Sequence, residues 1–356
     1  MHIEYDGDPF EDRPEGTIDR FEETVPRPRR QSEIGPNANH LVWEFDQEGS
    51  KWFQQNELVR LDPGQYTAFQ SHLPDVEGPK EVCLRIFDGR ARLRTEYWDE
   101  TLERFDTVLI PPNTAYQIGN PTTEPLWYAA IASVGDNEVP EASSLPVHER
   151  PGAAEEYRRI MAARKERGLP TPEDAGDYDG DPEKDRPEPE VRPFSETFPV
   201  HFTEALETTG ANSNRNDWIT SFEHSEWITQ NSLLSLEPGE YVSMHAHFDN
   251  EGPYEENYWI IDGKARLQTE YWDTTLHKHD CAFFTTGVPH GLGNCGTDTL
   301  WFAAWSSKGG HTSDFDIDDV ETSERPGLKE EYRRVMAARK KRGLPLPPHV
   351  DVDLGE

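Results

Sequence analysis

Residues 241–294 read YVSMHAHFDNEGPYEENYWIIDGKARLQTEYWDTTLHKHDCAFFTTGVPHGLGN. Within this stretch His245 and His247 are two residues apart, and His290 follows in a loop that contains Gly and Pro. Glu256 comes directly before an apolar, strand-like run. Three imidazoles and one carboxylate can together coordinate a divalent metal ion. Because alternate residues of a strand point to the same face, His245 and His247 are expected to reach the same side of a sheet.

Most of the chain repeats itself at an offset of 173 to 175 residues. The motif TEYWD stands at 95–99 and 269–273, and ERPG stands at 149–152 and 324–327. Each ERPG opens a helix-like segment that ends in RGLP, and such Pro and Gly positions mark helix boundaries. The chain is therefore a duplicated unit. We expect an N-terminal extended arm at 1–37, a first domain with its helix at 38–168, an acidic Pro-rich linker at 169–195, a second domain with its helix at 196–346, and a tail at 347–356.

Short apolar runs fill both units between these segments. The two Asp-Gly pairs at 88–89 and 262–263 stand between such runs and are typical of hairpin turns. Many short strands with regular turns indicate an all-β sandwich or barrel, with each closing helix packed outside. The expected strands are 59–61, 82–87, 91–95, 107–111 and 126–132 in the first unit, and 233–236, 241–244, 258–261, 265–269, 281–285 and 300–305 in the second.

The second unit resembles the cupin superfamily, and the duplicated chain resembles a bicupin. The first cupin motif corresponds to Gly239, His245, His247, Glu256 and Gly263, and the second to Gly287, His290 and Asn294, preceded by Asp280. The resemblance covers roughly 38–145 and 215–306. It implies two tandem cupin barrels of the jelly-roll or double-stranded β-helix type, each followed by a C-terminal α-helix.

The choice of carboxylate depends on comparing the two units. The gap from His247 to Glu256 is longer than is usual in cupins, and Glu251 and Glu255 are nearby alternatives. The motif EGP at 77–79 and 251–253 sets the register, so that Glu81 matches Glu255 and Val82 stands where Glu256 does. We therefore expect Glu256 to bind the metal, and Glu251 and Glu255 to be structural. Another departure from the cupin pattern is Thr285, which replaces the usual Pro of the second motif.

The first unit has lost the other ligand residues. His72 corresponds to His247, but Gln70 replaces His245 and Tyr116 replaces His290. The first barrel is expected to be metal-free and structural, with Tyr116 filling the former ligand cavity.

The resemblance implies one divalent metal ion in the second barrel, and the residues do not distinguish Fe, Mn, Zn, Ni or Cu. We expect an enzyme for a small organic substrate, first an oxidoreductase of dioxygenase type, because an open coordination position in an apolar and aromatic pocket suits oxygen chemistry. The alternative is a redox-neutral lyase or isomerase with the metal as Lewis acid. A further alternative is a small-molecule-binding protein without turnover.

Tyr258 is the second candidate for catalysis. It lies two residues after Glu256 and should share its inward face, so Tyr258 or Glu256 could move a proton beside the metal. The alternative for Tyr258 is an ordinary wall aromatic. His277 and His279 form another His-x-His pair, but they lack the surrounding carboxylate and Gly positions and are expected at the surface.

The composition is strongly acidic. The formal net charge is −34, hydrophobic residues make up 34%, and only ten of the 35 basic residues are lysine. Abundant carboxylates keep a surface hydrated at high ionic strength, which favours a halophile over a merely acidic mesophilic protein. The charge argues against a nucleic-acid partner, which would need a basic surface.

The compartment follows from what the sequence lacks. No apolar run has the length of a membrane span, and the acidic N-terminus is not that of a signal peptide. Three cysteines do not make a disulfide framework. We expect a cytoplasmic protein without a membrane partner; a homo-oligomer is compatible with the sequence.

Overall fold

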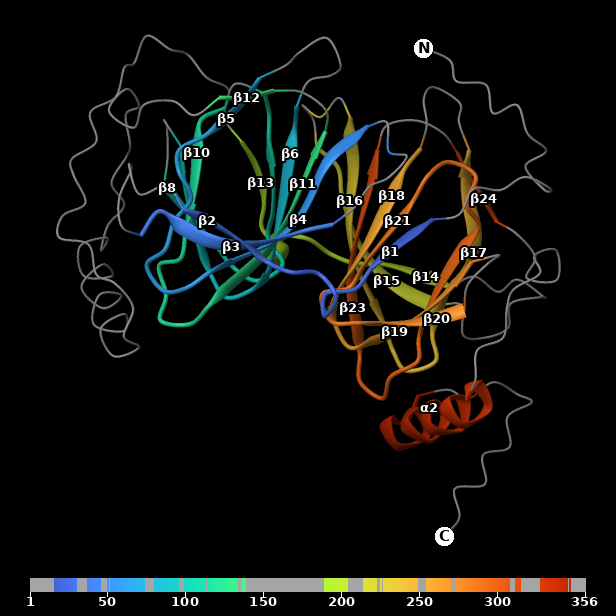
Figure 1. Ribbon diagram of the computed structural model, residues 1–356. Coiled ribbons are helices and arrows are strands. Elements are labelled where there is room, and N and C mark those ends of the chain that lie inside the picture. The colour runs from blue at the N-terminus through green and yellow to red at the C-terminus, as the bar shows by residue number, and fades with distance from the viewer. Residues whose placement is uncertain are drawn as a thin grey trace.

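The computed structural model places two β barrels side by side, the first in blue to green and the second in yellow to red (Figure 1). This confirms the tandem cupin-type architecture. The structure describes residues 16–30, 37–45, 50, 52–73, 80–95, 99–112, 114–133, 136–138, 189–203, 214–222, 225, 227–248, 254–269, 273–307, 311–314, 327–344 and 346.

The first barrel consists of one large sheet and smaller facing sheets. The large sheet has seven strands in the order β13-β9-β6-β11-β4-β3-β2, and the facing strands form the sheets β10-β7-β8 and β12-β5. Their bounds are β2 Arg27–Arg30, β3 Asn39–Glu44, β4 Phe53–Leu61, β5 Ser71–Leu73, β6 Val82–Asp88, β7 Ala91–Thr95, β8 Asp99–Leu102, β9 Thr107–Ile110, β10 Tyr116–Gly119, β11 Leu126–Ser133, β12 Asp136–Glu138 and β13 Glu190–Arg192.

The second barrel repeats this plan. A seven-stranded sheet, β1-β21-β18-β23-β16-β15-β14, faces the five-stranded sheet β20-β19-β22-β17-β24. The bounds are β1 Thr17–Asp19, β14 Val200–Thr203, β15 Asn214–Thr220, β16 Ile228–Leu236, β17 Tyr241–Phe248, β18 Glu256–Asp262, β19 Lys264–Thr269, β20 Asp273–His277, β21 Cys281–Phe284, β22 His290–Asn294, β23 Leu300–Ser307 and β24 His311–Asp314; a 3-10 helix η2 spans Phe194–Glu196, and helix α2 spans Leu328–Arg342.

The large sheets are buried on both faces, which explains their nearly continuous apolar runs. In β18, Tyr258 and Ile260 point into the second barrel, whereas Trp259 and Ile261 point toward the first barrel. Strand β6 divides its residues in the same way between a barrel interior and the interface. The seven-stranded sheets therefore pack against each other, and a one-residue step along β18 changes which barrel a side chain enters.

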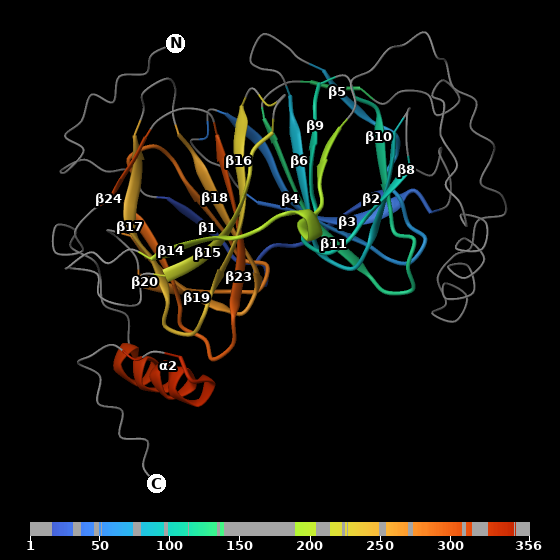
Figure 2. The same cartoon turned by 180° about the vertical axis from the view of Figure 1, so that it is seen from behind.

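The segments that precede the barrels are exchanged between them. Strand β1 precedes the first barrel but pairs with β21 of the second, and β13 precedes the second barrel but pairs with β9 of the first. Figure 1 shows the dark blue β1 among the orange strands and labels β13 in the first barrel, and Figure 2 shows the same two barrels from behind. Asp280 accepts a hydrogen bond from the Phe21 backbone N–H at 2.9 Å, and Asp106 accepts one from Phe194 at 2.7 Å. These segments were expected only as an extended arm and a linker, because their short polar strands lack apolar alternation.

Helix α2 lies below the second barrel (Figure 1). Gly239, in the left-handed conformation at φ 77°, lies against it so closely that an added Cβ would come within 2.6 Å of Met336. Arg339 is buried and donates a hydrogen bond to the Pro238 carbonyl at 2.6 Å. The second closing helix is thus confirmed on the outside of its barrel.

Some expectations fall outside the described residues. These are the helix at 155–168, Glu251, and the EYW motifs at 96–98 and 270–272. Cys83, Cys281 and Cys295 are buried thiols. No helix in the part of the chain that the structure describes is long and apolar enough to cross a membrane.

Candidate metal centre

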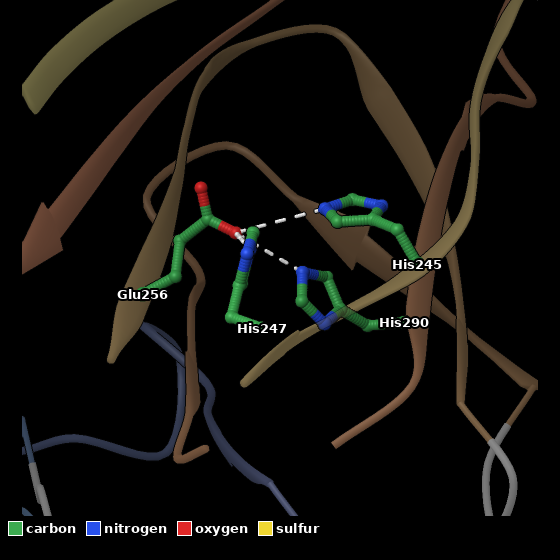
Figure 3. A group of neighbouring side chains, drawn as sticks. All are labelled: His245, His247, Glu256 and His290. Atoms are coloured by element: carbon green, nitrogen blue, oxygen red, sulfur yellow. Dashed lines mark hydrogen bonds and ion pairs between the residues drawn. The ribbon is translucent and has the colours of Figure 1, made fainter. Parts of the chain in front are cut away.

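Three strands bring the predicted ligands together inside the second barrel. His245 and His247 are alternate residues of β17 and line the same cavity. Glu256 begins β18 in the facing sheet. His290 begins β22, the hydrogen-bonded neighbour of β17. All four side chains are buried and point toward one another (Figure 3).

The prediction that His290 lies in a loop was wrong, because the residue is the first of strand β22. Its register partner is His245, so the backbone pairing of β17 and β22 fixes two ligands beside each other. The Gly and Pro signal belongs to the turn before the strand, where Gly287 has a positive φ of 85°. A ligand held by a strand pair is more precisely positioned than one held by a loop.

The carboxylate of Glu256 lies at the centre of the metal-binding group. Its Oε2 atom lies 2.8 Å from His247 Nε2, 3.0 Å from His290 Nε2 and 3.9 Å from His245 Nε2. One ligand atom from each of the four residues lies within 4.8 Å of all the others. Donors bound to one ion at about 2.0–2.2 Å are separated by roughly 3 to 4 Å, so the group fits one divalent ion with small side-chain shifts. The predicted metal-binding group is therefore present.

Neighbouring groups orient the ligands. His245 Nδ1 donates to the Ser243 carbonyl at 2.8 Å, and His290 Nδ1 donates to the Val288 carbonyl at 2.9 Å. Since a carbonyl oxygen only accepts, both rings carry their proton on Nδ1 and present the Nε2 lone pair to the ion. Ser306 Oγ donates to Glu256 Oε1 at 3.3 Å. The donors are thus held in the protonation state and orientation that metal binding needs.

The electrostatics favour the same state. Burial by itself would raise the pKa of Glu256, but the neighbouring histidines, His247 above all, hold that pKa well below its usual range. Burial lowers the pKa of His247, and burial with a contribution from His245 lowers that of His290 to about 4. An ionised carboxylate with neutral imidazoles is the combination that binds a cation.

Glu255 and Glu256 illustrate how one position along a strand decides a function. Glu256 points into the barrel, whereas the Glu255 side chain reaches the first barrel. There its Oε2 accepts hydrogen bonds from Ser50 Oγ at 2.7 Å and from the Trp52 backbone N–H at 3.3 Å. Glu255 is therefore a structural contact between barrels, as the comparison of the two units predicts.

Glu81 makes the reciprocal contact. Its Oε2 accepts hydrogen bonds from Ser225 Oγ at 2.8 Å and from the Trp227 backbone N–H at 3.1 Å, both in the second unit. The pair of glutamates thus belongs to the duplicated scaffold. Glu256 has no such counterpart, because Val82 occupies its place in β6.

Tyr116 lies in the first barrel where His290 lies in the second. Gln70 and Tyr116 are bridged as His245 and His290 are. Gln70 Nε2 donates to the Tyr116 hydroxyl at 2.8 Å, and His72 Nε2 lies 2.9 Å from that oxygen. The phenol therefore contacts the side chains at two former ligand positions.

A cavity of about 130 Å³ adjoins the metal-binding group. This volume holds about four water-sized groups, so a ligand there has to be small. Only a few apolar side chains contribute to the wall. Besides His245, His247 and Glu256, the lining consists of Arg215, Asp217, Gln230, Ser232, Leu234, Val242, Ser243, Tyr254, Tyr258 and Ala304.

Tyr258 lies in this cavity wall, as its spacing from Glu256 predicts. The residue is 3% exposed, and its hydroxyl lies 3.5 Å from His245 Nε2. Burial, reinforced by the Glu256 charge, raises the pKa of Tyr258 well above its usual value. The phenol therefore keeps its proton and is a donor toward the cavity.

Sequence reasoning missed the polar residues of β15 and β16. Arg215, Asp217 and Ser232 line the cavity, and their first-unit counterparts are His40, Val42 and Glu57. The repeat comparison that selected Glu256 also contained this signal. It was overlooked because β15 lacks the apolar alternation that identifies a strand.

The second His-x-His pair divides between surface and interior. His277 is exposed, as expected. The surface prediction was wrong for His279, which is buried between the barrels and packs on Trp127 with ring centroids 4.7 Å apart. Neither contributes to the metal-binding group.

Comparisons with known proteins agree with this architecture. A model of the Cupin domain family matches residues 232–305, which include all four ligands. Oxalate decarboxylase from Bacillus subtilis at pH 4.6 aligns with a TM-score of 0.54 and 16% identity, covering 85% of this chain and 78% of that chain. A second oxalate decarboxylase structure, described as showing a structural element that modulates proton-coupled electron transfer, aligns with a TM-score of 0.54 and 17% identity. The alignment covers 87% of this chain and 81% of that chain. No curated protein sequence matches the chain.

These likenesses at 16–17% identity define the fold and leave the reaction open. The chain therefore has the fold of a protein with two cupin-like barrels. The second barrel matches the Cupin domain and carries a three-histidine, one-glutamate metal-binding group.

Proposed function

We propose that this protein is a metal-dependent enzyme that converts a small, polar organic molecule in its second barrel. One observation carries the proposal: the buried group of His245, His247, Glu256 and His290 adjoins a small cavity lined mainly by polar side chains. A structural metal site would be closed by its protein ligands and would need no such cavity.

A divalent ion bound by these four residues would supply Lewis-acid chemistry toward an oxygen of the substrate. The chain's own groups would do the rest. Tyr258 holds a proton on its hydroxyl beside the ligand His245, at the wall of the cavity. Glu256 is engaged by histidines and by Ser306, so in this proposal it binds the ion and Tyr258 delivers the proton.

The lining of the cavity supports one of the two reaction types over the other. The expectation of a dioxygenase depends on an apolar and aromatic pocket. In the structure, Arg215, Asp217 and Gln230 give the cavity a charged and hydrogen-bonding wall. Such a wall suits a polar substrate and proton transfer. A redox-neutral lyase or isomerase is therefore our first candidate reaction.

A dioxygenase-type oxidoreductase is the second candidate. The donor set favours it, because four protein ligands leave room for both a substrate and dioxygen on an ion that takes six ligands. A small-molecule-binding protein without turnover is the remaining alternative.

The test measures turnover of the metal-loaded protein on a panel of small organic acids and polyols, under argon and in air. We expect equal rates in both, with no oxygen uptake. Tyr258→Phe should lower kcat by about 10²-fold or more, the usual size of general acid catalysis. Tyr116→Phe in the first barrel is the matched control and should keep full activity. Turnover that stops under argon, with stoichiometric oxygen uptake in air, would establish the dioxygenase. Binding of metal and of a small molecule without turnover of any compound would favour the small-molecule-binding protein.

A further inference from the structure

Two charged residues of β15 face the cavity together. Arg215 and Asp217 are alternate residues of this strand and line the cavity with His245, His247 and Glu256. They are supplied by the seven-stranded sheet, on which β15 lies two strands beyond β23. The cavity therefore has charged groups from β15 in addition to the metal-binding group.

Asp217 is unusual for a buried carboxylate. It is 5% exposed, and its Oδ1 atom has no hydrogen-bond partner. The carboxylate has a side-chain hydrogen bond with Ser232, and its Oδ2 atom is 4.0 Å from Arg215 Nε, at the outer limit of an ion pair. An unpartnered buried acceptor destabilises the fold, so it indicates a site that a donor group is meant to fill.

Arg215 is positioned by an aromatic ring. Its guanidinium carbon lies 4.4 Å from the centroid of Phe202 on the neighbouring strand β14. Stacking holds the guanidinium at the wall of the cavity, and its planar array of N–H donors matches the geometry of a carboxylate. Arginine is the side chain best suited to pair with a carboxylate.

The first barrel does not contain this pair. His40 and Val42 occupy the equivalent positions of β3, as the register with β2 and β4 shows. Its buried carboxylate, Glu57, is instead closed by an ion pair with Arg29 of β2. The Arg–Asp pair thus occurs where the metal ligands occur and is missing where they are missing.

We propose that Arg215 and Asp217 form the substrate-recognition pair of the metal cavity, and that they select a short-chain carboxylate bearing a hydroxyl group. Arg215 would bind the carboxylate, and Asp217 Oδ1 would accept the hydroxyl proton in a hydrogen bond. The cavity of about 130 Å³ limits the molecule to a few carbon atoms. This inference rests on the proposed function, since it names the substrate class of the same site.

The test is calorimetric binding of lactate and propionate to metal-loaded protein, because these acids differ only by the hydroxyl group. We expect lactate to bind at least about tenfold more tightly, since a site built for a hydroxyl rejects the analogue that lacks it. Asp217→Val, which copies the first barrel, should remove this preference and keep propionate binding. Arg215→Gln should weaken both acids by about tenfold or more. Asp217→Ala and Arg215→Met repeat the test should either first variant fail to fold.

Glu57→Gln is the matched control, because it removes a buried carboxylate from the equivalent strand of the first barrel. It should leave the binding of both acids unchanged. Equal affinities for the two acids, no binding of either acid, or a lactate preference that survives Asp217→Val would each overturn the recognition pair. Metal content is measured in every sample. A wild-type protein that takes up no metal would overturn the proposed function instead. The same titrations on metal-free protein would then test separately whether Arg215 and Asp217 recognise the two acids.

Discussion

Asn56 in β4 and Asn231 in β16 are equivalent residues, and each reaches across the interface into the other barrel. Trp259 Nε1 donates to the side-chain oxygen of Asn56 at 3.0 Å. The guanidinium of Arg85 donates to the side-chain oxygen of Asn231 at 2.6 and 3.0 Å. Duplication therefore gave each barrel one carboxamide at the interface, but the two carboxamides now receive hydrogen bonds from different donors.

The different donors predict unequal costs of mutation. Arg85 is 2% exposed, and burial lowers its pKa to about 10. Asn231→Ala leaves that buried charge without its main side-chain partner, which should cost about 3 kcal/mol. Asn56→Ala removes hydrogen bonds to neutral groups only, the donor Trp259 and the acceptors Asn257 and Cys281, and should cost about 1–2 kcal/mol. Denaturant unfolding measures both values, and an equal loss in the two variants would contradict this account.

The metal content should be about one divalent ion per chain, since the described residues contain one group of four convergent donors. The double variant His245→Ala with His290→Ala should lose the ion, as elemental analysis of the purified protein would show. His72→Ala, at the first-barrel position equivalent to the ligand His247, is the control and should keep it. Chelation of the wild-type protein should lower its Tm, because ligands that bind only the folded state stabilise it. Two ions per chain, or retention of the ion by the double variant, would be incompatible with the site.

Alanine substitutions of Glu251, Glu255 and Glu256 should differ in their effects on metal content and stability. Glu256→Ala should empty the metal site. Glu255→Ala should keep the ion but lose charge-assisted hydrogen bonds to the first barrel, at a cost of about 3 kcal/mol in unfolding free energy. Glu251→Ala should keep the ion as well. A Glu251→Ala protein without metal, beside a fully loaded Glu256→Ala protein, would show that the carboxylate assignment is wrong.

Asp217 should make the protein less stable as the pH rises. Burial raises its pKa from 3.8 to about 6, partly opposed by Arg215. Between these values the unfolded chain binds fewer protons than the folded one, so stability falls through this window and stays lower above about pH 6. The shift corresponds to about 3 kcal/mol. In chelated protein, Asp217→Asn should therefore melt above the wild type at pH 7.5, and the two should converge near pH 4; a difference that does not vary with pH would refute this.

We propose that the acidic composition is an adaptation to a salt-rich cytoplasm, and this too can be measured. With a formal net charge of −34, carboxylates should repel one another at low ionic strength, where the screening length is about 30 Å at 0.01 M. The Tm should rise as KCl increases to molar concentration. Equal additions of sucrose, which does not screen charge, serve as the control. A Tm that stays constant across the KCl series would exclude a salt requirement.

The metal group could be predicted because each of its signals is local. The spacing of His245 and His247 predicts that both lie on the same face of a strand. Because Val82 stands at the position of Glu256 in the metal-free unit, the repeat comparison selects Glu256 over the two neighbouring acids. The structure adds the physical reason for that choice. Glu255 and Glu256 enter different barrels because consecutive strand residues point to opposite faces.

The missed features depend on contacts between distant segments. His279 looks like a surface residue in sequence, but it packs against Trp127 of the other barrel and Phe21 of the N-terminal segment. Asp217 belongs to a strand whose polar sequence gives no periodic signal, so its place in the cavity follows from sheet order. The TID of β1 and the EVR of β13 are too short and polar to predict pairing, since backbone hydrogen bonds at a sheet edge do not depend on side-chain type.

The exchange of β1 and β13 constrains the order in which the chain can fold during synthesis. Thr17–Asp19 leaves the ribosome early, yet its partner Cys281–Phe284 is translated only after most of the chain, a delay of tens of seconds at typical elongation rates. The first barrel is likewise incomplete until Glu190–Arg192 has emerged. A gene split between the two barrels would therefore give two polypeptides that each carry a strand belonging to the other, and each could be completed only by its sibling.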